Sequence, residues 1–204
     1  GYHGRVIARS GMTRRRFLQG ALAGGVLAAA CEGSSRKPPN LLVLVADDQR
    51  ADSTGFGGSP VPTPELDTLA GESAVFSEAF VTTSVCACSR ASLLSGQTVS
   101  RHGIRDFGMP FRASAFAETY PAVLRRAGYH TGFVGKWGVK FERGVMSEHF
   151  DTYRPMSPPY LRERDGQDAR HLTDRTADEA IRFIAEDAGE EPFCLTLSFN
   201  APHA

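Results

Sequence analysis

The residues with the clearest chemical potential are Cys86 and Arg90, which stand four positions apart in Val85-Cys86-Ala87-Cys88-Ser89-Arg90. The small and apolar residues from Ser89 to Ser95 predict a helix. The thiol and the guanidinium then flank a helix start, where free backbone N–H groups attract anions. The Cys-x-Cys spacing alone is a weak indication of metal or redox chemistry, and no second cysteine pair supports a zinc site. The segment indicates anion binding beside a thiol, unless Arg90 is an ordinary surface arginine.

Two adjacent carboxylates, Asp47 and Asp48, follow the continuous apolar run from Asn40 to Ala46. Such a run predicts a central parallel strand covered on both faces. The carboxylates then lie at its carboxyl end, where ligands collect in open α/β sheets. Their oxygens suit a hard divalent cation. The alternative is that the pair serves only as a turn or helix cap.

The elements that must position these residues alternate between helix and strand, which predicts an α/β fold: a mostly parallel sheet with helices on both faces. Thr63 is the expected N-cap of the first helix. A polar loop is expected from Ser147 to Asp168. The apolar face of the last helix is expected at Ala177, Ala180, Ile181 and Ile184. Helices are predicted at Pro64–Gly71, Ser89–Ser95, Tyr120–Gly128 and Thr173–Asp187, and extended segments at Asn40–Ala46, Val75–Val81, Thr131–Val134 and Phe193–Ser198.

Charge is distributed unevenly along the chain. Residues 1–30 hold five arginines and no acid, so the remainder carries 18 basic and 23 acidic groups, a net charge of −5. A mildly acidic protein has no long-range attraction for nucleic acid, so we expect no nucleic-acid partner, and an anionic substrate must be held by a local cluster. The cysteines do not form a disulfide framework, and Cys194, in an apolar strand, is expected as a buried free thiol.

Residues 12–30 resemble a twin-arginine export signal, with Thr13-Arg14-Arg15-Arg16-Phe17 before an apolar stretch. The stretch is shorter than the roughly 20 residues of a membrane-spanning helix. The resemblance implies the twin-arginine export machinery as a partner and a periplasmic or cell-surface location. Residues 1–11 would then be translated from upstream of the true start codon, and residues 31–39 would form a linker. Leu27-Ala28-Ala29-Ala30-Cys31 permits either an Ala-x-Ala cleavage site or a lipobox with a lipid anchor on Cys31.

The motifs, taken in order, resemble the type I sulfatases of the alkaline-phosphatase-like superfamily. The stretch Cys86–Gly96 resembles their Cys-x-Pro-x-Arg signature, with Cys88 where the family usually has proline, and Gly138 stands where it usually has histidine. Further matching segments are Asn40–Arg50, Thr63–Phe76, Ala127–Lys136 and Asn200–His203. Residues 40–204 are therefore expected to be the N-terminal part of a longer, truncated catalytic domain.

The resemblance implies a metal-dependent sulfuric ester hydrolase whose nucleophile is formylglycine, made from Cys86 by a formylglycine-generating enzyme. Arg90 would brace the nucleophile and the metal-bound oxygens, Lys136 would contact sulfate and nucleophile, and His203 would donate a proton to the leaving-group oxygen. The residues assigned in this way are Asp47, Asp48 and Cys86 around the divalent metal, with Cys86, Arg90, Lys136 and His203 in catalysis.

Other readings stay open from the sequence. Lys136 could face solvent, His203 could be an ordinary loop histidine, and for His102 a local structural role is the stronger expectation. A phosphoryl-transfer relative would normally carry Thr or Ser in place of Cys86, and a non-catalytic binder of sulfated glycans would keep the thiol. The substrate could be an aryl, choline or carbohydrate sulfate, with specificity loops expected at Arg101–Phe111 and Ser147–Asp168.

Overall fold

The computed structural model describes residues 37–142, 149–164 and 167–203. The expected export signal at residues 12–30, the residues before it and the lipidation candidate Cys31 lie outside the described residues. Within the described part, no helix has both the length and the apolar character that crossing a membrane requires.

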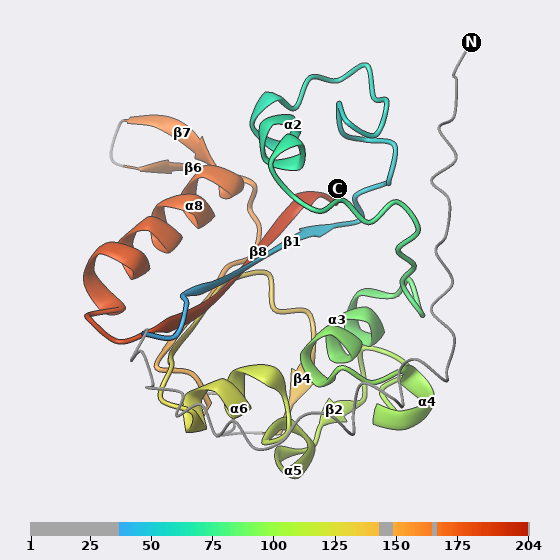
Figure 1. Cartoon of the computed structure of the whole chain (residues 1–204), viewed down its shortest axis with the longest axis vertical. Coiled ribbons are helices and arrows are strands. Elements are labelled where there is room, and N and C mark those ends of the chain that lie inside the picture. Colours follow the sequence, from blue (N-terminus) through green and yellow to red (C-terminus); the bar gives the residue numbers. More distant parts are fainter. Residues whose placement is uncertain (1–36, 143–148, 165–166, 204) are drawn as a thin grey trace, which may run out of the picture. The chain divides into compact units, whose positions relative to one another are not determined.

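A four-stranded sheet organises the unit that begins at Pro38 (Figure 1). Its order is β1-β8-β3-β5, and every neighbouring pair is parallel. This confirms the predicted α/β fold with a mainly parallel sheet. The strands are β1 (Leu41–Asp47), β3 (His130–Gly135), β5 (Thr152–Pro155) and β8 (Phe193–Pro202).

Helices and short strands connect these four strands. Two small sheets pair β2 with β4 and β6 with β7. The connecting elements are α2 (Pro64–Gly71), α3 (Cys86–Ser95), α4 (Val99–His102), β2 (Pro110–Phe111), α5 (Ala113–Phe116), α6 (Tyr120–Arg126), β4 (Lys140–Phe141), β6 (Leu161–Arg164), β7 (Gln167–His171), α8 (Leu172–Arg182) and the π-helix η1 (Phe183–Asp187).

At β3 both faces of the sheet are covered, by two separate hydrophobic clusters. Successive strand residues point to opposite faces. Phe133 of β3 therefore packs into a largely aromatic cluster with Phe116 of α5 and Trp137. Its neighbour Val134 packs on the other side with Phe183, where α8 continues into η1. The helices on both faces were expected from the alternation of elements.

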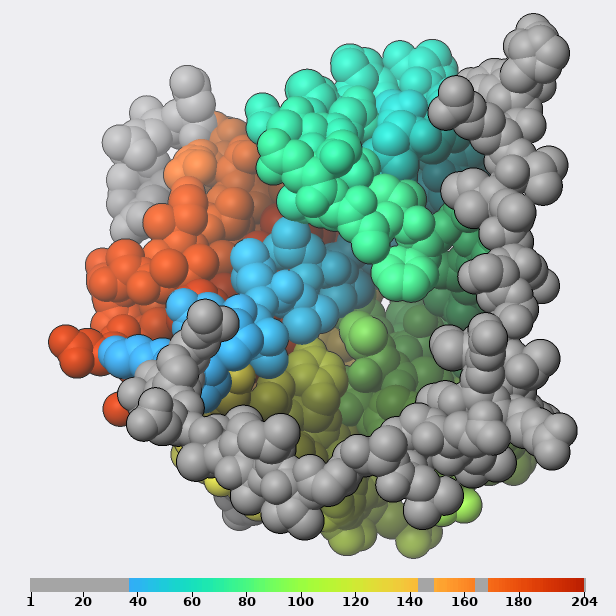
Figure 2. Space-filling view, in the orientation of Figure 1, coloured from blue at the N-terminus to red at the C-terminus, as the bar shows by residue number. Residues whose placement is uncertain are grey.

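The position of β1 differs from the prediction. Among the described residues β8 pairs with one side of β1, which lies at the edge of the sheet, and Leu42 and Leu44 are 50% and 52% exposed. Figure 2 shows this segment, in blue, at the molecular surface. The expectation of a strand covered on both faces is therefore wrong for the described residues, because an apolar sequence specifies a strand but not the neighbours present to cover it.

Two other segments correct the sequence reading. Val75–Val81 forms no strand, and its Phe76 and Phe80 are 83% and 84% exposed. The expected loop from Ser147 to Asp168 contains β5 and β6. The brevity and polarity of β5, an edge strand, explain why its sequence resembles a loop.

Local side-chain contacts also differ from expectation at two helices. Thr63 occupies the N-cap position of α2, as predicted, but its side chain makes no capping bond, because its hydroxyl accepts from Gly55 N and donates to Asp67. The buried stripe of α8 consists of Leu172, Thr176 and Ala180, whereas the expected Ile181 and Ile184 are 64% and 46% exposed. Thr176 tolerates burial because its hydroxyl donates to the carbonyl of Leu172 at 2.7 Å.

Asp151 ties the start of β5 to β3. Its Oδ2 accepts from the Thr131 backbone N–H at 2.8 Å and from the Thr131 hydroxyl at 3.1 Å, and its Oδ1 accepts from Arg125 Nε at 2.9 Å. Burial raises the pKa of this carboxyl, but the bonds from Thr131 and Arg125 outweigh it and hold the pKa below its usual value. The ionised form of Asp151 therefore stabilises the fold.

Asp151→Asn is expected to lower the free energy of unfolding at pH 7 by about 1–2 kcal/mol, because hydrogen bonds to a charged group are lost. A lowered folded-state pKa gives stability that is present above the unfolded pKa, roughly 3.9, and is lost as pH falls through the folded pKa. The free energies of unfolding of the wild-type and Asp151→Asn proteins, measured with urea, should converge at the acidic end of that pH range. Asp52→Asn, at an exposed pair with Arg50, is the control. A constant difference down to the lowest pH would contradict this role.

Candidate functional site

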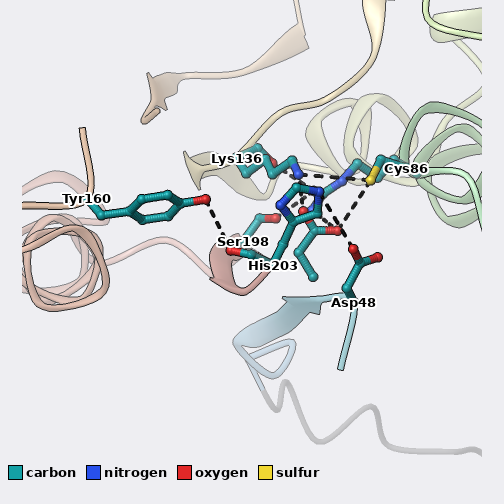
Figure 3. Close-up of polar contacts among 8 residues, drawn as sticks. Asp48, Cys86, Lys136, Tyr160, Ser198 and His203 are labelled. Carbon is teal, nitrogen blue, oxygen red and sulfur yellow. Dashed lines mark hydrogen bonds and ion pairs between the residues drawn. The ribbon is translucent and has the colours of Figure 1, made fainter. Parts of the chain in front are cut away.

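The six side chains singled out in the sequence come together at the carboxyl ends of β1, β3 and β8 (Figure 3). Carboxyl ends of parallel strands share one edge of a sheet, which is why motifs far apart in the sequence can meet there. The residues are Asp47, Asp48, Cys86, Arg90, Lys136 and His203.

Asp47, the last residue of β1, is the centre of the cluster. Its side chain is buried; Oδ1 lies 3.5 Å from Cys86 Sγ and 3.7 Å from Arg90 Nη2, and Oδ2 is paired with Lys136 Nζ. Burial raises the pKa of this carboxyl, but Lys136 and Arg90 outweigh burial and hold the pKa below its ordinary value. Asp47 is therefore a carboxylate that gathers two cations around the thiol.

Asp48 has a left-handed backbone with φ of 57°, a conformation uncommon for a residue other than glycine. The turn carries the chain away from β1 directly after Asp47. Its side chain is 61% exposed, and Oδ2 lies 3.6 Å from Nε2 of His203. The two adjacent carboxylates therefore face different surroundings: one is buried among cations, the other open to solvent.

Cys86 is the first residue of α3, three positions before the predicted helix start. Its neighbours in the first turn therefore present free backbone N–H groups beside the thiol. Burial, and then the negative charge of Asp47, raise the pKa of the Cys86 thiol. The shift favours the thiol over the thiolate, and the protonated thiol is the poorer nucleophile.

Arg90 lies one helical turn after Cys86 on the same side of α3. It is 8% exposed, and its Nη1 donates to the Lys136 carbonyl at 2.7 Å and to Ser198 Oγ at 2.6 Å. The alternative of an ordinary surface arginine is therefore wrong. The guanidinium joins α3 to the ends of β3 and β8.

Lys136 directly follows β3, at a point where the backbone of this segment packs tightly against β8. Its backbone N–H donates to Ser198 O at 2.8 Å, and Gly135, with φ of 106°, brings its Cα so close that a Cβ would lie 1.9 Å from that same oxygen. The Lys136 side chain turns into the cluster, with Nζ 3.9 Å from Cys86 Sγ. It is 19% exposed, so the solvent-facing alternative is wrong.

His203 follows β8 and is held through its backbone. Its N–H donates to the Asp47 carbonyl at 3.1 Å, and its carbonyl accepts from the Tyr160 hydroxyl at 3.1 Å. Figure 3 shows Tyr160 approaching from the side opposite Cys86. These contacts place the imidazole beside Asp48 rather than in an unrelated loop.

Two residues at the site were missed in the sequence. Ser198 is fully buried and bonds Arg90, and Tyr160 bonds His203. A hydroxyl within the apolar run of β8 is the one sequence signal that could have indicated Ser198; Tyr160 falls in a segment expected to be a loop. His102 bonds Ser92 and the Ile104 N–H at 3.0 Å each, as a local structural role predicts.

Two cavities flank the cluster. A smaller one, about 320 Å³, is lined by Asp47, Asp48, Cys86 and Arg90. A larger one, about 620 Å³, is lined by Lys136, His203 and the segment around Tyr160. The thiol and the carboxylates therefore open on one side of the cluster, and the lysine and the histidine open on the other.

The donor set of the cluster fits a divalent cation. Asp47, Cys86 and His203 each offer a ligand atom, and these atoms lie within 4.8 Å of one another. Asp47 and the exposed Asp48 supply hard carboxylate oxygens, the ligands that calcium and magnesium prefer. Lys136 and Arg90 together more than balance the charge of the Asp47 carboxylate, whereas Asp48, beside His203, is the more exposed carboxylate of the pair.

Comparison with known proteins agrees with this geometry. The chain is 28% identical over 179 residues to an N-acetylglucosamine-6-O-sulfatase of Bacteroides thetaiotaomicron, covering 82% of the chain and 31% of that protein. It is 35% identical over 155 residues to arylsulfatase A of Bos taurus, covering 71% and 28%. A solved structure of BT4656 with its substrate D-glucosamine-2-N,6-O-disulfate superposes with a TM-score of 0.70 at 27% identity, covering 82% of this chain and 35% of that one.

These matches define the family and the extent of the similarity. The chain spans about a third of the length of the relatives it matches, 31% of the first and 28% of the second. The family model described as Sulfatase matches residues 39–204, nearly all of the described part. The chain therefore belongs to the sulfatase family, within the alkaline-phosphatase-like fold.

Proposed function

We propose that the protein containing these residues hydrolyses sulfate esters with a formylglycine nucleophile made from Cys86. The observation that carries the proposal is the convergence of Cys86, Arg90 and Lys136 around the buried Asp47 in a sulfatase-family chain. The sulfatases that the chain resembles act, by their names, on sulfated sugars and aryl sulfates.

The chemistry of sulfate release supports this choice of nucleophile. A hydrated aldehyde at position 86 supplies one hydroxyl that attacks sulfur while the ester oxygen departs, and deprotonation of the second hydroxyl then expels sulfate and restores the aldehyde. An unmodified thiol has no second hydroxyl for that step. The first turn of α3 presents its N–H groups to the anion at that position.

The other side chains divide the remaining work. Lys136 and Arg90 place fixed positive charge beside the position of the sulfate oxygens. His203, which opens on the larger cavity, donates a proton to the departing oxygen. Asp47 keeps the two cations together and oriented before substrate arrives.

Asp47, Asp48 and the modified residue at position 86 would hold the divalent metal, for which we propose calcium, a cation that binds carboxylate oxygens. Such a cation acts as a Lewis acid on the sulfate oxygens. The formylglycine-generating enzyme is the partner that the conversion of Cys86 requires. Export through the twin-arginine machinery and lipidation at Cys31 stay predictions from residues outside the described part.

Alkylation followed by tryptic mass analysis tests the nucleophile. The peptide that ends at Arg90 carries both Cys86 and Cys88. In an active preparation we expect an aldehyde at Cys86 and a single alkylated cysteine, Cys88. Cys88→Pro, which restores the usual signature, is the matched variant and should leave the peptide without alkylation. Two alkylated cysteines in a preparation with full activity would overturn the formylglycine mechanism.

A further inference from the structure

Both polar groups of the His203 backbone are hydrogen-bonded. The N–H donates to the carbonyl of Asp47, at the end of β1, and the carbonyl accepts from the Tyr160 hydroxyl, each at 3.1 Å. Tyr160 lies on the side of His203 opposite Cys86 (Figure 3). The two bonds fix the peptide groups on either side of the Cα atom and therefore the direction in which the imidazole leaves the backbone.

Tyr160 is itself held at its ring and at its backbone. The ring stacks on His171 with centroids 6.0 Å apart and planes at 13°, and the Tyr160 carbonyl accepts from the N–H of Leu172, the first residue of α8, at 2.6 Å. His171 also caps α8 by accepting from Thr173 N at 3.1 Å. The hydroxyl that reaches His203 is therefore preorganised by the start of a helix, and it cannot turn away without loss of these contacts.

Proton donation depends on where the imidazole lies. In the proposed reaction sulfur bonds the hydrated aldehyde, the S–O bond to the alcohol breaks, and its electron pair stays on the ester oxygen. That oxygen takes a proton from His203, which later recovers one from water through the larger cavity. A displacement of a catalytic group by roughly 1 Å lowers the rate about 10²-fold. The bonds that fix the His203 backbone therefore bear on the reaction.

We propose that Tyr160 is a positioning residue for proton donation by His203, and that it extends the reaction to esters of alcohols that leave poorly. The inference rests on the proposed function and adds a residue to its machinery. A 4-nitrophenolate, stabilised by its nitro group, departs with little help from a proton, whereas an unsubstituted phenolate or an alkoxide needs one. Loss of the Tyr160 hydroxyl therefore slows the hydrolysis of the second kind of ester and spares the first.

The test compares two substrates in the full-length protein. The measured quantity is kcat/KM for phenyl sulfate divided by kcat/KM for 4-nitrophenyl sulfate, two esters with the same ring and different leaving groups. Tyr160→Phe keeps the ring on His171 and should lower this ratio about tenfold, part of the roughly 10²–10⁴-fold that a general acid contributes. Tyr153→Phe, on β5 with its ring 5.7 Å from that of Phe133, is the matched control and should keep the wild-type ratio. An unchanged ratio in Tyr160→Phe overturns the proposal.

A double-mutant cycle shows whether Tyr160 acts through His203. His203→Ala should lower the ratio further than Tyr160→Phe does, and the two substitutions together should lower it no further than His203→Ala alone. A merely structural role of Tyr160 would instead lower kcat/KM for both substrates alike and leave the ratio unchanged. Independent, additive effects of the two substitutions on the ratio would also overturn the proposal.

Hydrogen exchange at the His203 amide separates this inference from the proposed function. The amide is bonded to Asp47, so weaker anchoring by Tyr160 should make its exchange, followed by mass spectrometry, several-fold faster in Tyr160→Phe and not in Tyr153→Phe. If the wild-type protein hydrolyses neither sulfate yet the exchange responds in this way, the proposed function fails and the anchoring of His203 stands. If both sulfates are hydrolysed and neither the ratio nor the exchange responds to Tyr160→Phe, the function stands and the role of Tyr160 fails.

Discussion

Lys136→Met is expected to lower kcat/KM for sulfate-ester hydrolysis on the order of 10²–10³-fold, the effect of removing one preorganised charge from a transition state. Lys136 Nζ is paired with Asp47 and lies 3.9 Å from Cys86 Sγ, so its charge sits where the sulfate oxygens must pass. Steady-state kinetics on 4-nitrophenyl sulfate measures the change. Most of the loss should appear in kcat, because the charge on the sulfate oxygens grows toward the transition state.

The controls separate charge from shape. Lys140→Met changes an exposed lysine of β4 four residues later and should leave the kinetics unchanged. Lys136→Arg keeps the charge but replaces a compact ammonium by a wide planar group, and is expected to restore only part of the activity. Activity near the wild-type level in Lys136→Met would exclude the lysine from the reaction.

Gly138→His, which introduces the residue usual in the family, is expected to reduce activity about tenfold or more rather than raise it. Gly138 has φ of 74°, and a Cβ there would lie 2.8 Å from Cδ and 3.1 Å from Nε of Arg90. The guanidinium would have to leave Ser198 and the Lys136 carbonyl. When a displacement misplaces a catalytic group by roughly 1 Å, the reaction rate falls about 10²-fold.

Gly103→Ala is a matched control for the backbone. Gly103 has φ of 76°, but a Cβ there meets nothing within 4 Å. Gly103→Ala should lose only the stability that a left-handed conformation costs an alanine, about 1–2 kcal/mol. Gly138→Ala should lose this stability too, and the collision of its Cβ with Arg90 should also lower activity. Thermal unfolding and kinetics on both variants distinguish the two effects. A gain in kcat for Gly138→His would contradict this expectation, because it would show that Arg90 can move aside without loss of activity and that a histidine at this position assists the reaction.

Much of the site was predictable because three of its motifs adjoin strand ends and the fourth adjoins a helix start. Asp47 ends one apolar run, and Lys136 follows the glycine that ends a second apolar run. Because the carboxyl ends of parallel strands lie at the same edge of a sheet, both residues are expected at that edge. The grouping of the six side chains is observed, while their roles in catalysis remain predictions. The α/β alternation is confirmed by the strand order and the parallel pairing.

The errors concern features that depend on contacts made only in the folded chain. The sequence of β5 resembles a loop because Thr152–Pro155 becomes a strand only by pairing with β3. The polarity of Thr176 argues against a place on the buried face of α8, but a bond to the carbonyl of Leu172, one turn earlier, offsets that polarity. Ser198 is an isolated hydroxyl in an apolar strand, and its role as a partner of Arg90 becomes evident only from the distance of 2.6 Å between Ser198 Oγ and Arg90 Nη1.

The bond between Arg90 and Ser198 joins residues 108 positions apart, and this separation sets an order of events during synthesis. At roughly 5–20 residues per second, about 5–20 s pass between the addition of Arg90 and that of Ser198 to a growing chain. During this interval β8 does not exist, so it can neither cover the guanidinium nor complete the wall around the thiol. If Cys86 is converted as proposed, the converting enzyme would therefore meet the signature most openly on the ribosome, before the strand that completes the site has been made.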